Sequence, residues 1–152
     1  MDWTIGRRTL LGTLAGGLVF PDLAFSQSRQ GETGMKVEFA FSNHVFTATL
    51  HDTASARDFA SMLPLELKVT DFSDNEKIAY LPRKLTLEGN APYSDPAAGD
   101  LCYYVPWGNI IFYYKDYSGG SRDVIRLGRL DKGIEPLLTR GDFPLRARAL
   151  QR

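Results

Sequence analysis

The chain has 152 residues, with 18 Lys and Arg against 18 Asp and Glu, so its formal net charge is zero. This length allows one compact domain, and a neutral chain lacks the basic surface that nucleic acids and anionic membranes attract. A single cysteine excludes an intramolecular disulfide and a cysteine-rich metal cage. We therefore expect a globular protein with no nucleic-acid partner, no metal and no other cofactor.

Residues 1–26 have the features of an export signal. Arg7 and Arg8 precede an apolar run over 10–20, which is too short to cross a bilayer, and small residues lead up to Ser26. We predict cleavage after Ser26, which leaves no stable membrane anchor and an exported, periplasmic or secreted protein. The paired arginines and the glycine-containing apolar run are typical of a twin-arginine signal, and an ordinary Sec signal is the alternative.

After the signal, the polar stretch 27–34 is expected to be a flexible linker. Apolar and polar residues then alternate over 36–41 and 45–50, a pattern typical of a β-hairpin. Apolar residues at helical spacing predict a single helix over 54–63, which Pro64 ends.

The rest of the chain is expected to contain mainly short strands. They cover 65–69, 78–81, 101–105, 110–115 and 124–130, with a loop over 89–100, a helical turn over 134–138 and a basic, solvated tail over 141–152. Seven or so strands and one short helix predict an all-β fold, either a barrel or a sandwich. We favour a small closed β-barrel in a domain over 35–140, because closure removes exposed strand edges.

Four segments carry a likeness to a known family: T-A-S-A-R-D-F-A-S-M-L-P-L (53–65), E-K-I-A-Y-L-P-R-K-L (76–85), G-D-L-C-Y-Y-V-P-W-G-N-I-I-F-Y-Y-K-D (99–116) and I-R-L-G-R-L-D-K-G-I (125–134). They resemble, in the same order, the cyclophilin-like domain family of small bacterial proteins. The resemblance runs from about Met35 to Leu138. It implies a small closed barrel akin to that of cyclophilins, the peptidyl-prolyl isomerases.

The catalytic pattern of true cyclophilins is a separate matter. Those enzymes use an arginine in an F-H-R-like segment, together with a glutamine and aromatic groups around a proline pocket. This chain has no such segment, and its glutamines occur only at Gln27, Gln30 and Gln151. Arg83 is the only arginine in a comparable mid-chain position. Catalytic residues therefore stay unassigned, and a divergent prolyl isomerase with Arg83 as its electrophilic group remains an alternative.

Aromatic residues concentrate around two neighbouring predicted strands. They are Tyr103, Tyr104, Trp107, Phe112, Tyr113, Tyr114 and Tyr117. Alternation places Tyr104 and Phe112 on one face of these strands. It places Tyr103 and Tyr113 on the other, so one pair belongs to the core and the other lies outside it or in a cleft.

Two short motifs are candidates for a ligand site. Trp107 and Asn109 flank a glycine, and together they can form the wall of a pocket for a flat or prolyl ligand. The simpler interpretation is a turn whose tryptophan closes one end of the barrel. Tyr80 and Arg83 can present a cation beside an aromatic ring, or form no more than a solvated strand end.

These patterns predict a non-catalytic domain that binds a small molecule or a peptide of unknown identity. The predicted lining residues are Tyr80, Arg83, Tyr104, Trp107, Asn109 and Tyr113. In this hypothesis the arginine supplies charge or hydrogen bonds, the asparagine an amide, and the rings apolar walls. A third hypothesis is a subunit whose aromatic ridge packs on another protein. The only other expected partner is the twin-arginine or Sec export machinery.

Overall fold

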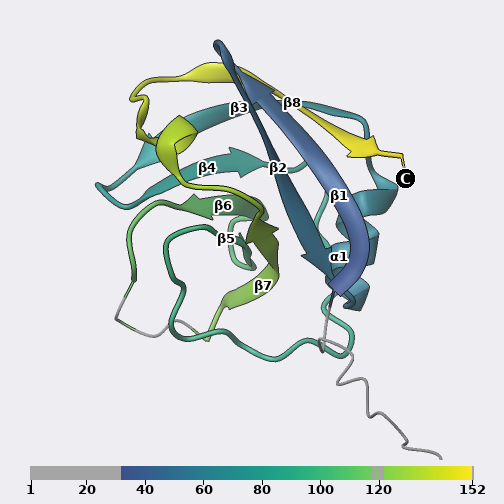
Figure 1. Ribbon diagram of the computed structural model, residues 1–152. Helices are drawn as coiled ribbons and strands as arrows, with labels where there is room; N and C mark the ends of the chain where they lie inside the picture. Colours follow the sequence, from purple (N-terminus) through teal and green to yellow (C-terminus); the bar gives the residue numbers. More distant parts are fainter. Residues whose placement is uncertain (1–31, 118, 120–121, 152) are drawn as a thin grey trace, which may run out of the picture.

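The computed structural model describes residues 32–117, 119 and 122–151, and within them the alternating segments form eight strands (Figure 1). The strands are β1 (Glu32–Phe41), β2 (His44–His51), β3 (Leu65–Phe72), β4 (Glu76–Tyr80), β5 (Asp100–Tyr104), β6 (Asn109–Tyr113), β7 (Val124–Leu130) and β8 (Phe143–Leu150). They are joined by one α-helix, α1 (Ala54–Ser61), and one 3-10 helix, η1 (Glu135–Leu138).

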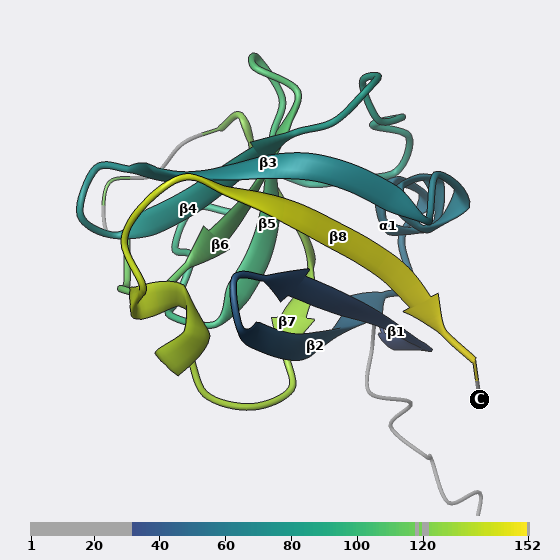
Figure 2. The same cartoon turned by 90° about the horizontal axis from the view of Figure 1, so that it is seen from above.

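The strands close into a barrel in the order β1-β2-β7-β5-β6-β4-β3-β8, with β8 returning to β1. All neighbouring strands are antiparallel. Figure 2 shows β3, β8, β1 and β2 following one another around the ring. The predicted all-β class and closed barrel are confirmed.

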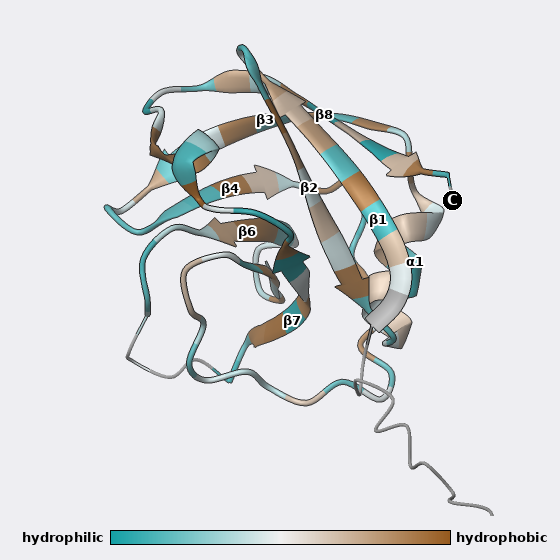
Figure 3. Cartoon of the chain, viewed as in Figure 1, coloured by the Kyte–Doolittle hydropathy of each residue, from teal (hydrophilic) through white to brown (hydrophobic). Residues whose placement is uncertain are grey.

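Side chains that alternate along the strands fill the barrel interior. On β1, Val37, Phe39 and Phe41 are buried, and hydrophobic and hydrophilic bands alternate along this strand in Figure 3. The Phe39 ring lies 5.5 Å from that of Phe46 and 4.9 Å, edge-on, from that of Phe112. Burial of these rings removes apolar surface from water and provides the main stabilisation of the fold.

The two helical segments close the interior from opposite sides (Figures 1 and 2). Helix α1 begins at the N-cap Thr53, whose hydroxyl accepts a hydrogen bond from the Ala56 amide at 3.2 Å, and it buries Phe59 in the core. The 3-10 helix contributes Leu137 to the same core. Helix α1 ends at Ser61, two residues before the expected end. Within the described residues, no helix is long and apolar enough to cross a membrane.

The C-terminal segment corrects the prediction of a solvated tail over 141–152. Residues Phe143–Leu150 form β8, which pairs with both β1 and β3 and so completes the barrel. Leu145 and Ala147 face the interior and are 1% exposed, whereas Arg148 points outward to Glu38, with 2.7 Å between Nε and Oε1. The arginines therefore mark the solvent face of a strand, and the barrel extends past residue 140.

The N-terminal predictions are only partly covered. The proposed signal, 1–26, and the linker up to residue 31 lie outside the described residues. The remainder of the expected linker, 32–34, is the start of β1. The barrel therefore begins three residues before the expected position, 35.

The structure also corrects the predicted faces of the two aromatic strands. Tyr103 and Phe112 are both buried in the main core, whereas Tyr104 and Tyr113 belong to the outer face. The reason is the register of the two strands, in which Tyr104 pairs with the residue at position 109. Even-numbered residues of β5 therefore share a face with odd-numbered residues of β6. Alternation along each strand was right, and its extension through the turn was wrong.

A second, smaller apolar cluster lies on the outer face of β4, β6, β5 and β7. Its buried members are Ile78, Cys102, Ile111, Tyr113 and Val124, with Tyr93 and Tyr104 packed against them. Tyr93 belongs to the loop that precedes β5, and its hydroxyl donates to Asp100 at 2.9 Å. Asp100 is fully buried and is also held by Arg126 and Arg129 at 3.0 and 2.8 Å. These contacts fasten the loop over part of the outer face.

The barrel interior contains one buried cation among the described residues. Lys77 on β4 is 0% exposed, and its Nζ lies 2.7 Å from Oδ1 of Asp71. It also lies 5.5 Å from the ring centroid of Phe41 and 5.9 Å from that of Phe143. Asp71 in turn accepts from the Gly141 amide at 2.6 Å. The charge is therefore fully partnered within the fold.

Candidate functional site

A pocket of about 380 Å³ opens on the outer face of β4, β6 and β5, and we call it the outer pocket. Its lining residues are Phe72, Ser73, Asn75, Glu76, Tyr104, Trp107, Asn109, Ile111, Tyr113, Tyr117 and Val124. Strand register explains why these side chains meet. Glu76 pairs with Tyr113 near one end, and Asn109 pairs with Tyr104 near the other. Paired residues present their side chains on the same face of the sheet.

Aromatic rings form much of the pocket wall. The Trp107 ring meets those of Phe72 and Tyr104 edge-on, at 5.4 and 5.3 Å between centroids. Trp107 is 47% exposed and Phe72 42% exposed, so these two rings form an open rim. Gly108 follows at φ +67°, a left-handed conformation that favours glycine and lets this four-residue turn fold back. The simpler interpretation, in which the tryptophan closes one end of the barrel, is therefore wrong. Trp107 lies at the rim of the outer pocket.

Asn109 is the most unusual polar residue of the site. Its side chain is 1% exposed, yet neither Nδ2 nor Oδ1 has a hydrogen-bond partner in the described part of the chain. A buried amide without partners costs about 1–3 kcal/mol or more, and most buried polar groups in proteins are paired. The lining of the outer pocket therefore contains one donor and one acceptor that the fold itself leaves unused.

Glu76 is the only charged residue among the described residues that line the outer pocket. Burial raises the pKa of its carboxyl group from 4.5 to about 7, although a hydrogen bond from the Tyr113 hydroxyl acts in the opposite direction. Burial and the nearby carboxylate also raise the pKa of Tyr113. The pair therefore offers a carboxyl group that changes its protonation near neutral pH.

The structure places four of the six predicted lining residues in one site. Tyr104, Trp107, Asn109 and Tyr113 all line the outer pocket. Tyr80 does not line it: this ring is 54% exposed and borders a separate shallow hollow beside Leu81 and Pro82.

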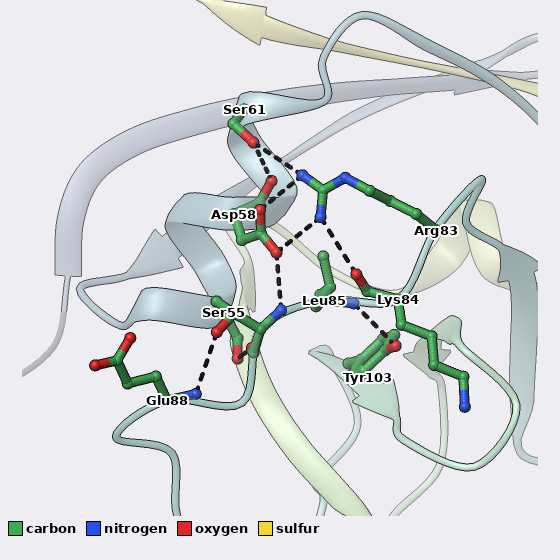
Figure 4. A network of polar contacts seen from close by, with 9 residues as sticks. Ser55, Asp58, Ser61, Arg83, Lys84, Leu85, Glu88 and Tyr103 are labelled. Carbon is green, nitrogen blue, oxygen red and sulfur yellow. Dashed lines mark hydrogen bonds and ion pairs between the residues drawn. The ribbon is translucent and has the colours of Figure 1, made fainter.

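Arg83 lies elsewhere, on the segment that crosses α1. Its two terminal nitrogens donate to the two carboxylate oxygens of Asp58 at 2.7 and 2.9 Å, in a two-pronged ion pair (Figure 4). Asp58 also accepts from the Thr86 amide at 2.8 Å. The arginine and that amide lower the pKa of Asp58 to about 2. In the structure, Arg83 fastens the 81–88 segment to the helix and is not among the residues that line the outer pocket.

The residues that the sequence analysis did not single out come chiefly from the β3–β4 hairpin. Phe72 ends β3, Ser73 and Asn75 lie in the turn, and Glu76 begins β4. This segment reads in the sequence as an ordinary polar turn, and only the pairing of β4 with β6 brings it beside Tyr113. No sequence signal available from a single chain identifies that pairing.

The outer pocket combines apolar, aromatic and polar groups. It offers an apolar floor at Ile111, aromatic walls, one free amide and one carboxyl group. Among the residues that the structure describes, no group of three or more His, Cys, Asp or Glu side chains is placed to hold a metal ion.

Comparisons with known proteins agree with this fold. The model of the cyclophilin-like family matches residues 39–148. The solution structure of a hypothetical protein from Archaeoglobus fulgidus is similar to this chain, with a TM-score of 0.64 and 16% sequence identity. The similarity covers 77% of this chain and 95% of the archaeal one, and it extends to the fold alone. No match was found among curated proteins.

Proposed function

The chain belongs to the cyclophilin-like family, and from that premise we propose that it is a binding domain that holds a small molecule or a peptide segment in the outer pocket. The observation that carries this proposal is the unpartnered amide of Asn109 in a pocket lined by aromatic rings. A ligand with a complementary donor and acceptor relieves the cost of the unpaired amide, and the rings bury its apolar part.

Ligand screening by NMR tests this function on the full chain. A library of small amides and short peptides is titrated into ¹⁵N-labelled protein, and the indole N–H signal of Trp107 is followed. The variant Trp107→Phe identifies that signal, because Trp3 is the only other tryptophan. We expect ligands to shift the signals of Trp107 and Asn109 together.

Two asparagine variants make the screen specific. Asn109→Leu should weaken the binding of any ligand found by about tenfold, since one or two hydrogen bonds are lost. Asn43→Leu, at an exposed turn residue between β1 and β2, is the matched control and should leave affinity unchanged. If both variants bind the ligand as the native protein does, the outer pocket is not its site.

A divergent prolyl isomerase is the second candidate function. The resemblance to cyclophilins supports it, and the engagement of Arg83 by Asp58 weighs against this arginine as the electrophilic group. A peptide isomerisation assay on the native protein and on Arg83→Ala separates the cases. A rate above background that disappears in the variant supports the isomerase, and a rate equal to background in both excludes it.

An interaction subunit is the third candidate. The aromatic rim of the outer pocket, with Phe72 and Trp107 nearly half exposed, is the observation that supports it. Sedimentation of the protein with and without Trp107→Ser tests self-association through this rim. A native dimer that the variant abolishes favours an interface between copies of the chain.

Export completes the proposed function. Arg7 and Arg8 before a short apolar run support a twin-arginine route. We expect the protein in the periplasmic fraction of a bacterial host, and we expect Arg7→Lys/Arg8→Lys to retain it in the cytoplasm. Export that persists in this variant indicates the Sec route, and a native protein confined to the cytoplasm contradicts export altogether.

A further inference from the structure

The charges around the outer pocket are unbalanced. Glu76 contributes a half-buried carboxyl group, and no Lys, Arg or His is among the described residues that line the pocket. Two basic residues close to Glu76 in the chain or in the sheet already have acidic partners. Lys77, next in the chain, points into the barrel to Asp71, and Lys115 lies 3.7 Å from Asp74. The carboxyl group of Glu76 therefore has a hydrogen bond from Tyr113 but no basic partner within 4 Å among the described residues.

The walls of the outer pocket favour positive charge as well. Five aromatic side chains line it: Phe72, Tyr104, Trp107, Tyr113 and Tyr117. The face of an aromatic ring carries partial negative charge and attracts organic cations, most strongly in Trp and Tyr. A carboxylate and several rings without a competing base form the environment that binds an ammonium group and repels an anion.

The two polar groups lie toward opposite ends of the pocket floor. Glu76 begins β4, and Tyr80, four residues later on that strand, pairs with Asn109. Four residues of extended strand correspond to roughly 13 Å. An elongated ligand, with its apolar part over Ile111, therefore spans the pocket floor from Glu76 toward Asn109.

We infer that the outer pocket binds an organic amine, with the ammonium group at Glu76, an apolar or aromatic body between the rings, and a neutral amide-like group at Asn109. This inference rests on the proposed binding function and narrows it to a class of ligand. The amine belongs either to a free small molecule or to the amino terminus or a lysine of a peptide. The shared chemistry is the ammonium group paired with the carboxylate.

Binding of an ammonium group should be linked to proton release. The groups that face or couple to Glu76 are the hydroxyl of Tyr113 on β6 and the thiol of Cys102 on β5. Burial keeps both of these neutral near pH 7, because it raises their pKa values. Of these three groups, Glu76 alone changes its charge in this range, and affinity for an amine should rise about tenfold between pH 6 and pH 8.

Matched probes test the inference on the full chain. 2-Phenylethylamine, 2-phenylethanol and 3-phenylpropanoate present the same ring with a cation, a neutral group and an anion. NMR titration at pH 7.5 should give an affinity order of amine, alcohol and carboxylate, with at least a tenfold preference for the amine over the alcohol. Phe-Gly-Gly and its N-acetylated form repeat the comparison for a peptide amine, and the stronger of the two amines identifies the source.

Two glutamate variants show whether Glu76 is responsible. Glu76→Gln keeps the shape and the hydrogen bond from Tyr113, and it should remove the preference for the amine and its pH dependence. Glu66→Gln, on β3 and outside the outer pocket, is the control and should preserve both. Equal binding of amine and alcohol by the native protein, or a preference that survives Glu76→Gln, overturns the amine assignment while the outer pocket remains a binding site. If none of the probes and no library member shifts the pocket signals, the proposed binding function fails with it.

Discussion

Two buried polar side chains on neighbouring strands differ in whether the chain supplies them with a partner. Lys77 on β4 faces the barrel interior, is 0% exposed, and has Asp71 at 2.7 Å and two phenylalanine rings around it. Asn109 on β6 faces outward, is 1% exposed, and has no hydrogen-bond partner among the described residues. The two strands are hydrogen-bonded to each other, so the inner and outer faces of one sheet differ in this respect.

This difference indicates what each residue does. A buried charge that its own chain neutralises serves the fold, because removing either partner leaves the other uncompensated. A buried amide that its own chain leaves unpaired lowers stability, and in the proposed function a ligand supplies its partner. Polar burial alone therefore does not support a binding site, and the proposed function rests on the amide that has no partner beside a pocket.

The largest effect should follow from breaking the interior pair. Asp71→Ala removes the partner of Lys77 and should lower the free energy of unfolding by about 3–5 kcal/mol, measured by urea denaturation. In the native protein burial acts to raise the pKa of Asp71, but the hydrogen bonds from Lys77 and Gly141 outweigh it and lower the pKa.

The double variant Asp71→Ala/Lys77→Met is the control for that prediction. It removes the Lys77 charge that Asp71→Ala leaves without a partner, so much of the lost stability should return. A single variant as stable as the native protein would show that Lys77 does not depend on Asp71.

The outer face should respond in the opposite direction. Asn109→Leu replaces an unpaired amide by an apolar group of similar length and should raise the free energy of unfolding by about 1–2 kcal/mol while it weakens ligand binding. Thermal and urea unfolding measure the first effect, and NMR titration the second. A loss of stability in this variant would mean that the amide is satisfied in solution and would remove the contrast with Lys77.

The carboxyl group of Glu76 in the outer pocket should make the stability of the protein depend on pH. Because the pKa of Glu76 is about 7 in the fold against 4.5 ordinarily, the folded state binds the proton more tightly. Its contribution to stability is therefore full below pH 4.5 and is lost as pH rises toward 7. Glu76→Gln should remove that slope and should be more stable than the native protein above pH 7 by about 1–2 kcal/mol, after allowance for solvent screening. Urea denaturation at pH 4.5, 6 and 8 measures it, with Glu66→Gln as the control.

The smallest effect on ligand binding is expected at Arg83. This side chain is paired with Asp58 and lies outside the outer pocket, so Arg83→Ala should leave probe affinities unchanged. Stability should fall at neutral pH, and that difference should shrink as pH drops from about 4 toward 2, where protonation of Asp58 breaks the pair in the native protein. A changed probe affinity in Arg83→Ala would support the sequence-based prediction that Arg83 belongs to the ligand site.

Most of the fold was predictable because each strand carries its own alternation. The strand at Val124–Leu130 was predicted with its observed bounds, and the hairpin and helix within two residues at most positions. The last strand was missed although Leu145 and Ala147 alternate with arginines. Small alanines and dense positive charge resemble a solvated end, and only pairing with β1 and β3 makes this segment a strand.

The site was less predictable because it depends on long-range pairing. Tyr104, Trp107, Asn109 and Tyr113 lie close together in the chain, and local alternation and a glycine turn were enough to group them. Glu76 reaches them only through the pairing of β4 with β6, for which the sequence carries no local signal. In the same way, nothing local reveals that Asp58 on the helix engages the arginine expected in the pocket.

The pairing of β8 with β1 and β3 has a consequence for chains that lack β8. Since β8 pairs with both β1 and β3, a chain that lacks β8 retains two unpaired strand edges, even when the other seven strands are present. The barrel therefore closes only when β8 is present to pair with both strands. A chain truncated near residue 142 should therefore aggregate through these unpaired edges and should not remain a soluble monomer.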